Sequence, residues 1–312
     1  MTEATAQPKA RSSTATAYLL LILAPLCWST NYPLVRLTAP DMPPFHLSFW
    51  RWLTAAILIS LVAAPHWKRD LPILLSRWKY MLVMGGVGIF LSNTGTYWGL
   101  HYTTATNGLL LQSATPMITM VSVFALFRET PGLRQCIAIL VSMIGVFVIA
   151  SAGSLANLAS LSLNIGDLLI VAGTGFYTIY SALLRVRPPV HQSTLIAGCF
   201  IIGTICFLPC FLAESALGGT LVMTPKNMGV ILFLAVVPTI FAMSLWGVGV
   251  DLIGATRAGQ FFHLIPAFGI LQAVLLLGEE LHLFHAVGIA LIAAGLIIAS
   301  RKARPQAAAE TA

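Results

Sequence analysis

Charged side chains are scarce in this chain of 312 residues. Only 9% of the residues are charged and 58% are hydrophobic, and the mean hydropathy is +0.88. Soluble domains carry roughly a quarter charged residues, which cover the folded surface. The composition therefore excludes an ordinary soluble enzyme, a disordered chain and a fibrous repeat, and it predicts a polytopic membrane protein.

Motifs for catalysis and metal binding are lacking as well. The five cysteines form no CxxC pair and lie in apolar runs, so we expect neither a disulfide framework nor a metal site. The sequence has no HExxH, no GxSxG and no GxxxxGK[ST] loop. A membrane-embedded enzyme and an ATP-driven pump are disfavoured, and no catalytic residue, metal or cofactor is expected. A channel or receptor is the other alternative.

Apolar runs of the length that crosses a bilayer, about 17–25 residues, recur along the chain. Continuous apolar runs exclude the alternating pattern of membrane β-strands. We therefore predict an all-α polytopic membrane protein with ten transmembrane helices, near residues 15–36, 45–64, 79–99, 103–127, 134–151, 164–184, 193–213, 227–249, 254–277 and 284–300.

Basic residues are distributed unevenly between the predicted loops. If the N-terminus lies inside, fourteen of the 17 Lys and Arg residues fall on the inner side, and three, Arg36, Arg51 and Lys226, fall on the outer side. The positive-inside rule then predicts a multi-pass protein of the plasma membrane with both termini in the cytoplasm. The net charge of +7 is thus a topology signal, so the bilayer is an expected partner and nucleic acid is not.

The chain also resembles itself at an offset of about 150 residues. Pro116 corresponds to Pro266, Glu129 to Glu279, and Trp28 to Tyr177. Each unit holds five predicted helices, an odd number, so the second unit starts from the opposite side of the membrane, as in many secondary transporters. We predict two inverted five-helix repeats at 15–151 and 164–300, an external linker at 152–163, and cytoplasmic tails at 1–14 and 301–312.

Several short motifs resemble those of a known family. They are Trp28-Ser29-x-Asn31, Phe49-Trp50-Arg51-Trp52, Trp98-Gly99-Leu100-x-Tyr102-Thr103-x-Ala105-x-Asn107 and Gly278-Glu279-Glu280. In their order they resemble the EamA branch of the drug/metabolite transporter superfamily. The resemblance implies an alternating-access carrier of small metabolites in the bacterial inner membrane, often an amino-acid exporter. Drug or cation efflux and nucleotide-sugar transport are alternatives on the same fold.

A substrate site in such a carrier needs polar and aromatic groups at mid-membrane. Asn31 could bind substrate, or it could only join helices by a hydrogen bond. Tyr97 and Trp98 are also consistent with an interfacial aromatic belt, and His263 with either a proton carrier or a structural histidine. The candidate substrate-binding residues are Trp28, Asn31, Asn93, Tyr97, Trp98, Asn107, Gln112, Tyr177, Tyr180, Trp246, Gln260 and His263.

Three further residues are candidates for gating. Pro116 and Pro266 each remove a backbone hydrogen bond and could serve as hinges or as static kinks. Arg51 could snorkel to the outer headgroups between two tryptophans, act as a gate, or anchor a substrate carboxylate.

Small residues recur every four positions in two other predicted helices, at Ala138 and Ser142 and at Ala286, Ala290 and Ala294. Small residues allow close helix packing, so we expect these helices to form a scaffold, and a homodimer through this face is a further candidate partner.

Overall fold

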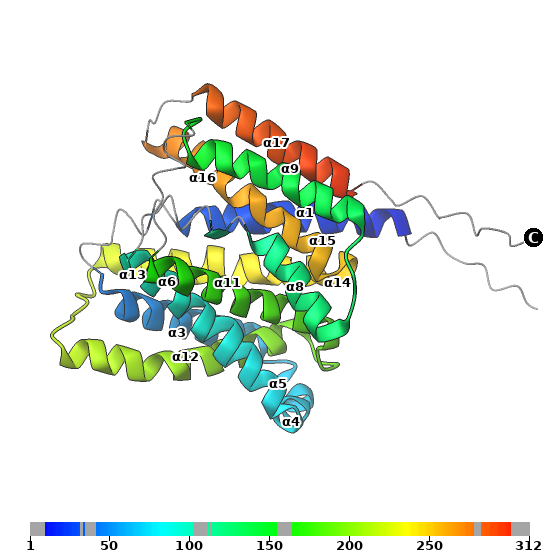
Figure 1. The fold of residues 1–312 in the computed structure, drawn as a ribbon. Helices are drawn as coiled ribbons and strands as arrows, with labels where there is room; N and C mark the ends of the chain where they lie inside the picture. The colour runs from blue at the N-terminus through cyan, green and yellow to red at the C-terminus, as the bar shows by residue number, and fades with distance from the viewer. Residues whose placement is uncertain are drawn as a thin grey trace, which may run out of the picture.

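The computed structural model of the chain consists of helices joined by turns (Figure 1), with no β-strand among the residues that it describes. These residues are 10–31, 34, 42–102, 111–112, 114–154, 164–277 and 282–300. A chain with continuous apolar runs forms helices in a bilayer because each helix satisfies its own backbone hydrogen bonds. The all-α prediction is therefore confirmed.

The helices follow one another in two comparable series. The first series is α1 (Ala10–Ser29), α3 (Pro44–Ala63), α4 (Trp67–Ser76), α5 (Trp78–Leu82), η2 (Val83–Leu91), α6 (Ser92–Tyr102), α8 (Thr115–Phe127) and α9 (Leu133–Ala150). The second is α11 (Ile165–Leu183), η3 (Leu184–Val186), α12 (Gln192–Ala216), α13 (Pro225–Leu234), η4 (Ala235–Phe241), α14 (Ala242–Ile253), α15 (Ala255–Gly259), η5 (Gln260–His263), α16 (Leu264–Leu277) and α17 (Leu283–Ser300).

Four helical segments of the described chain are long and apolar enough to cross a membrane by themselves. These are Pro44–Ala63, Ile165–Val186, Gln192–Ala216 and Pro225–Ile253. The segment Trp78–Gly99 is bent by 91° from α4. Since α4 has ten residues and four of the positions in 68–79 are Lys or Arg, we treat it as a surface helix beside the spans. The architecture is that of a polytopic membrane protein.

The two series interlock instead of forming separate domains. The most extensive helix pairs are α9 with α17, α3 with α12, α6 with α11, and α1 with α14, and every pair joins one series to the other. Figure 1 shows α9 and α17 side by side at one edge of the molecule, with α3 and α12 at the opposite edge. The core therefore forms between the two halves of the chain.

The pair α9–α17 is closely packed, although not through all the small residues expected. Gly145 lies against the backbone of Gly288, and Ser142 donates a hydrogen bond to the carbonyl of Ile292 at 3.4 Å. Ala286 and Ala290 are exposed. The expected scaffold forms, but on α17 the contact uses the glycines and not the alanine repeat.

The two candidate hinge prolines lie near the starts of α8 and α16. Pro116 is the second residue of α8, and Pro266 is the third residue of α16, directly after the 3-10 turn of η5. In the first turn of a helix the missing N–H of proline needs no helical acceptor. Pro266, however, follows α15 and η5 without a break, and the irregular geometry of η5 lies directly before it. The hinge role of both prolines stays a prediction.

Candidate functional site

Four aromatic rings from four helices meet in the core of the molecule. They are Trp28 of α1, Tyr177 of α11, Trp246 of α14 and Phe262 of η5, and we refer to them as the aromatic cluster. Trp28 stacks on Phe262 with ring centroids 5.2 Å apart and meets the edge of Tyr177 at 5.9 Å. The centroids of Trp246 and Phe262 are 4.7 Å apart. Such offset and edge-to-face contacts are the favoured geometries for aromatic pairs.

The position of Trp246 is fixed by packing and by one hydrogen bond. The residue is fully buried, and its indole N–H donates to the hydroxyl of Ser181 at 3.1 Å. A buried indole N–H requires such an acceptor. Tyr180, which precedes Ser181 on α11, is also buried and lies 5.7 Å from Tyr177 between ring centroids. Helices α11 and α14 therefore hold a preformed aromatic wall.

Buried polar atoms without a hydrogen-bond partner lie within three residues of members of the aromatic cluster in the sequence. Within the described part of the chain they include Oδ1 of Asn31, the hydroxyl of Tyr177 and both polar atoms of the Gln260 amide. Leaving such a group unpaired costs about 1–3 kcal/mol, so native proteins pair nearly all of them with protein, water or ligand. These amide and hydroxyl groups are available to a polar ligand beside the aromatic cluster.

A vestibule of about 810 Å³ lies between the two halves of the chain. Its walls come from the α8–α9 turn and from α11, α14 and α15. Two of its lining residues lie close in sequence to the aromatic wall: Ala182 directly follows Ser181, and Val250 lies one helical turn after Trp246. The other lining residues are Met120, Val123, Phe127, Arg128, Glu129, Thr130, Pro131, Gln135, Arg185, Asp251, Ile253, Gly254, Ala255, Thr256 and Arg257. The vestibule thus adjoins α11 and α14, the two helices that hold Ser181 and Trp246.

Charged residues surround the vestibule. Arg185 forms an ion pair with Glu129, which joins the end of α11 to the α8–α9 turn, and its guanidinium lies 5.2 Å from the ring of Phe127. Asp251 pairs with Arg187 at 2.8 Å. Arg128 and Arg257 add two exposed cations. Both carboxylates are paired, so Arg128 and Arg257 leave the lining of the vestibule with a net positive charge.

A second group of polar side chains joins α3 to α6, and Arg51 of α3 is at its centre. It is 4% exposed, and its guanidinium donates to the hydroxyl of Tyr97 and to Oδ1 of Asn93, both at 2.9 Å. The snorkelling alternative for Arg51 is therefore wrong, because the side chain turns into the bundle. Tyr97 is half-buried, and its hydroxyl accepts this bond; the interfacial belt stays an alternative for the residue.

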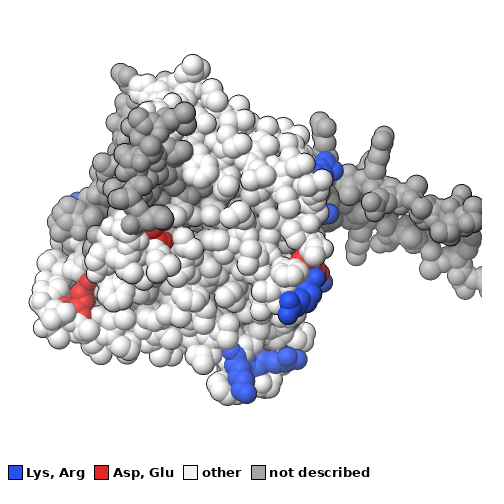
Figure 2. Space-filling model, in the orientation of Figure 1, with Lys and Arg blue, Asp and Glu red and all other residues white. Residues whose placement is uncertain are grey.

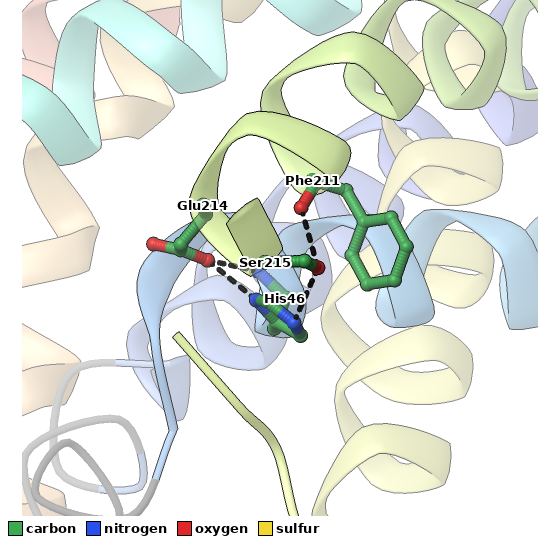
Figure 3. Close-up of polar contacts among 4 residues, drawn as sticks. All are labelled: His46, Phe211, Glu214 and Ser215. Atoms are coloured by element: carbon green, nitrogen blue, oxygen red, sulfur yellow. Dashed lines mark hydrogen bonds and ion pairs between the residues drawn. The ribbon is translucent and has the colours of Figure 1, made fainter. Parts of the chain in front are cut away.

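Two carboxylates hold the ends of the pair α3–α12. At one end Glu214 accepts from the backbone N–H of His46 at 2.8 Å and contacts its Nδ1 at 2.7 Å, while Ser215 lies 3.1 Å from Nε2 (Figure 3). At the other end the buried Asp70 accepts from the backbone N–H of His191 at 2.8 Å. The sequence analysis did not identify either carboxylate contact; the two histidines lie 145 residues apart, close to the offset of the internal repeat.

The predicted site residues therefore separate into groups. Trp28, Tyr177, Tyr180 and Trp246 come together, and Phe262 is the member that the sequence analysis missed, although it lies between Gln260 and His263. Both of those residues are buried in η5. Trp98 is 50% exposed and contacts Phe45, outside the aromatic cluster. Gln112 is half-buried before α8, and Asn107 lies outside the described residues.

Comparison with known proteins gives the class of protein that this fold and site define, a membrane transporter. The model of the EamA-like transporter family matches residues 15–151 and again residues 164–301. The chain belongs to this family.

Full-length relatives agree with the family. An "Uncharacterized transporter" of Archaeoglobus fulgidus is 27% identical over 91% of this chain and 97% of its own length. A "Probable terminal-alkyne amino-acid exporter" of Streptantibioticus cattleyicolor is 22% identical over 90% of this chain and 92% of its own. A solved chain described as "Crystal structure of protein" shares the fold with a TM-score of 0.77 at 17% identity, covering 93% of this chain and 97% of that one.

Proposed function

We propose that this protein is a secondary transporter that exports amino acids or related small metabolites by alternating access. The observation that carries the proposal is the vestibule of about 810 Å³ between the two halves, which is lined in part by α11 and α14, two of the helices that carry the aromatic cluster. Ligand pockets have volumes of about 300–1,000 Å³. A small metabolite entering the vestibule would reach groups at mid-membrane.

The helix pairs support two inverted five-helix repeats and ten transmembrane helices. A symmetry that relates the repeats would exchange α1 with α11 and α6 with α14, and it would carry the pair α1–α14 onto the pair α11–α6. The pairs α3–α12 and α9–α17 are each carried onto themselves. The π-helical segments η2 and η4 also fall in corresponding helices. An inverted repeat provides two related conformations, open to opposite sides of the membrane.

The chemistry of the site supports an amino acid as cargo. An amide both donates to a carboxylate and accepts from an ammonium group, and the rings provide a wall for an apolar or aromatic side chain. The relative named as an amino-acid exporter supports the same class. A cationic drug is the second candidate, favoured by the number of aromatic rings in the cluster, since ring faces attract cations.

The charge distribution supports cytoplasmic termini. Figure 2 shows blue side chains mainly at the lower and right edges, and a broad white face between them. The vestibule carries Arg128, Arg185 and Arg257, which belong to the predicted inner side. By the positive-inside rule the vestibule opens to the cytoplasm, as the loading side of an exporter.

Counterflow in proteoliposomes tests this function. Purified protein should exchange a labelled amino acid for unlabelled internal amino acid with saturation. Asn31→Ala and Tyr177→Ala should reduce the initial rate about tenfold, because each removes a polar group worth about 1.4 kcal/mol. Ala290→Val, on the exposed face of α17, is the matched control and should transport normally. Normal rates in both site variants, or flux that never saturates, would contradict the proposal.

A further inference from the structure

Arg51 is a buried cation without an acidic partner in the described chain. The acids that form ion pairs there are committed elsewhere: Glu214 to His46, Asp70 to Arg69, Glu129 to Arg185 and Asp251 to Arg187. Arg51 donates only to the neutral groups of Asn93 and Tyr97. A buried charge at membrane depth is costly unless an opposite charge meets it. The position is therefore one that an anion would stabilise.

Hydrogen-bond donors exceed acceptors around this cation. The guanidinium has five N–H groups, two of them used, and Nε has no acceptor. The indole N–H of Trp52 and the hydroxyl of Thr94 are buried and likewise without a partner among the described residues. A set of unsatisfied donors beside a positive charge matches the lone pairs of an anion.

The guanidinium packs against two aromatic rings. Its carbon lies 5.2 Å from the ring centroid of Trp52 and 5.5 Å from that of Tyr97. Because Nε is the guanidinium nitrogen without an acceptor, a ligand would bind along the N–H edge that includes Nε. In-plane approach to such an edge is the geometry of a bidentate arginine–carboxylate pair.

We propose that Arg51, held in place by Asn93 and Tyr97, binds the carboxylate of the transported metabolite. This inference rests on the proposed function and narrows its substrate class to carboxylates. A small cavity of about 10 Å³ adjoins the group and is lined in part by Ser48, Thr94 and Tyr97. That volume holds about one water molecule, so the cavity must widen to admit a carboxylate.

The position of Arg51 in the bundle indicates the conformation of the transport cycle in which it would bind the carboxylate. Arg51 lies near the start of α3, at the end of the pair α3–α12 that Glu214 closes. The vestibule adjoins the end of α11, which leads through η3 into the start of α12. Arg51 and the vestibule thus lie toward opposite ends of the bundle. The carboxylate would meet Arg51 in the conformation open to the side opposite the vestibule.

Intrinsic tryptophan fluorescence of the full-length protein in detergent tests the proposal. The probes are L-leucine and L-phenylalanine, each titrated against its amide at constant ionic strength. At least one acid should bind wild type about tenfold more tightly than its amide, since one charge-assisted pair contributes about 1.5–3 kcal/mol. Arg51→Gln should abolish this ratio, and Arg51→Lys should reduce it because the planar fork is lost. Lys68→Gln, which removes an exposed charge on α4, should leave the ratio unchanged.

The outcomes separate the possible explanations. If Arg51→Gln does not fold, Tyr97→Phe takes its place, and it should lower the ratio because the guanidinium loses an orienting partner. No acid preference in wild type, an unchanged ratio in the folded variants, or equal saturation by chloride alone overturns the proposal. An equal loss of the ratio in Asp41→Asn also overturns it, by indicating a counter-ion within the chain. Counterflow without an Arg51-dependent preference for the acid refutes the carboxylate site and leaves the transporter function intact. An Arg51-dependent preference for the acid without any flux supports the carboxylate site and contradicts the transporter function.

Discussion

Replacing Gly145 with alanine measures how closely α9 and α17 approach. A Cβ atom at this position would lie 2.6 Å from the carbonyl oxygen of Gly288 and 2.9 Å from Cβ of Leu291. The first of these atoms belongs to the backbone, so no side-chain rotation relieves the overlap. The two helices must separate along their whole contact, or one of them must shift.

The size of the effect follows from two opposing terms. Overpacking of a well-packed core costs about 1–3 kcal/mol, and alanine regains up to about 1 kcal/mol of helix propensity over glycine. The net destabilisation is then about 0–2 kcal/mol, with a central value of about 1 kcal/mol. Gly269, in α16, is the matched control because a Cβ there meets no atom within 4 Å. At that position only the propensity term acts, so the same substitution should stabilise the protein.

Apparent melting temperature in one detergent is the assay. For a chain of this size, Gly145→Ala should lower it by about 2–4 °C, and Gly269→Ala should leave it equal or raise it. Gly295→Ala should behave like Gly145→Ala, since its Cβ would lie 2.6 Å from the carbonyl oxygen of Ala138. A melting temperature of Gly145→Ala at or above that of wild type would refute the close approach.

Three other substitutions have defined outcomes. Ser181→Ala leaves the fully buried indole N–H of Trp246 unpaired and should cost about 1–3 kcal/mol, seen as a lower melting temperature. Glu129→Gln breaks an ion pair whose side chains are about half exposed; it should change stability by less than about 1 kcal/mol, but change the counterflow rate if the pair closes the vestibule. The hydrogen bond from Arg69, with that from the N–H of His191, lowers the pKa of Asp70 to about 2. Because this folded-state pKa lies below the unfolded one, the melting-temperature difference between wild type and Asp70→Asn should be constant from about pH 8 to 5 and shrink below about pH 4.

The internal repeat allowed part of the site to be predicted from the sequence. Trp28 and Tyr177 correspond at an offset of 149 residues, and in the structure their rings are in contact at 5.9 Å. Residues equivalent by duplication meet when they lie close to the axis that relates the repeats. The same reasoning applies to α9 and α17, where Gly145 faces Gly288 and Gly295 faces Ala138.

The rotation of each helix could not be predicted. In a soluble protein the apolar face identifies the buried side, but a membrane helix is apolar on both its lipid-facing and its packed side. Arg51 was therefore equally compatible with headgroups and with the interior, and Trp98 with a cavity and with lipid. Only the packing of α3 against α12 and of α6 against α11 decides these orientations.

Irregular helix geometry could be predicted only in part. The 3-10 turn of η5 lies directly before Pro266, whose missing N–H leaves the carbonyl of Phe262 without its α-helical donor, so the sequence offered a candidate bend here. The contact of Phe262 with Trp28 and the burial of Gln260 and His263 could not be predicted, because they depend on tertiary packing and not on local propensity.

The reciprocal caps on α3 and α12 indicate which parts of the molecule move together. Glu214, in the last turn of α12, accepts the N–H of His46 at the start of α3, and Asp70, beyond the end of α3, accepts the N–H of His191 at the start of α12. A carboxylate at a helix N-terminus is stabilised by the unpaired N–H groups and by the helix dipole. Both caps are formed in one conformation, although they lie at opposite ends of the bundle. Under the proposed alternating access, an opening between α3 and α12 would break one cap at each step, so we expect these two helices to stay paired. The ion pair of Glu129 and Arg185, whose side chains are about half exposed, is a weaker contact than these caps.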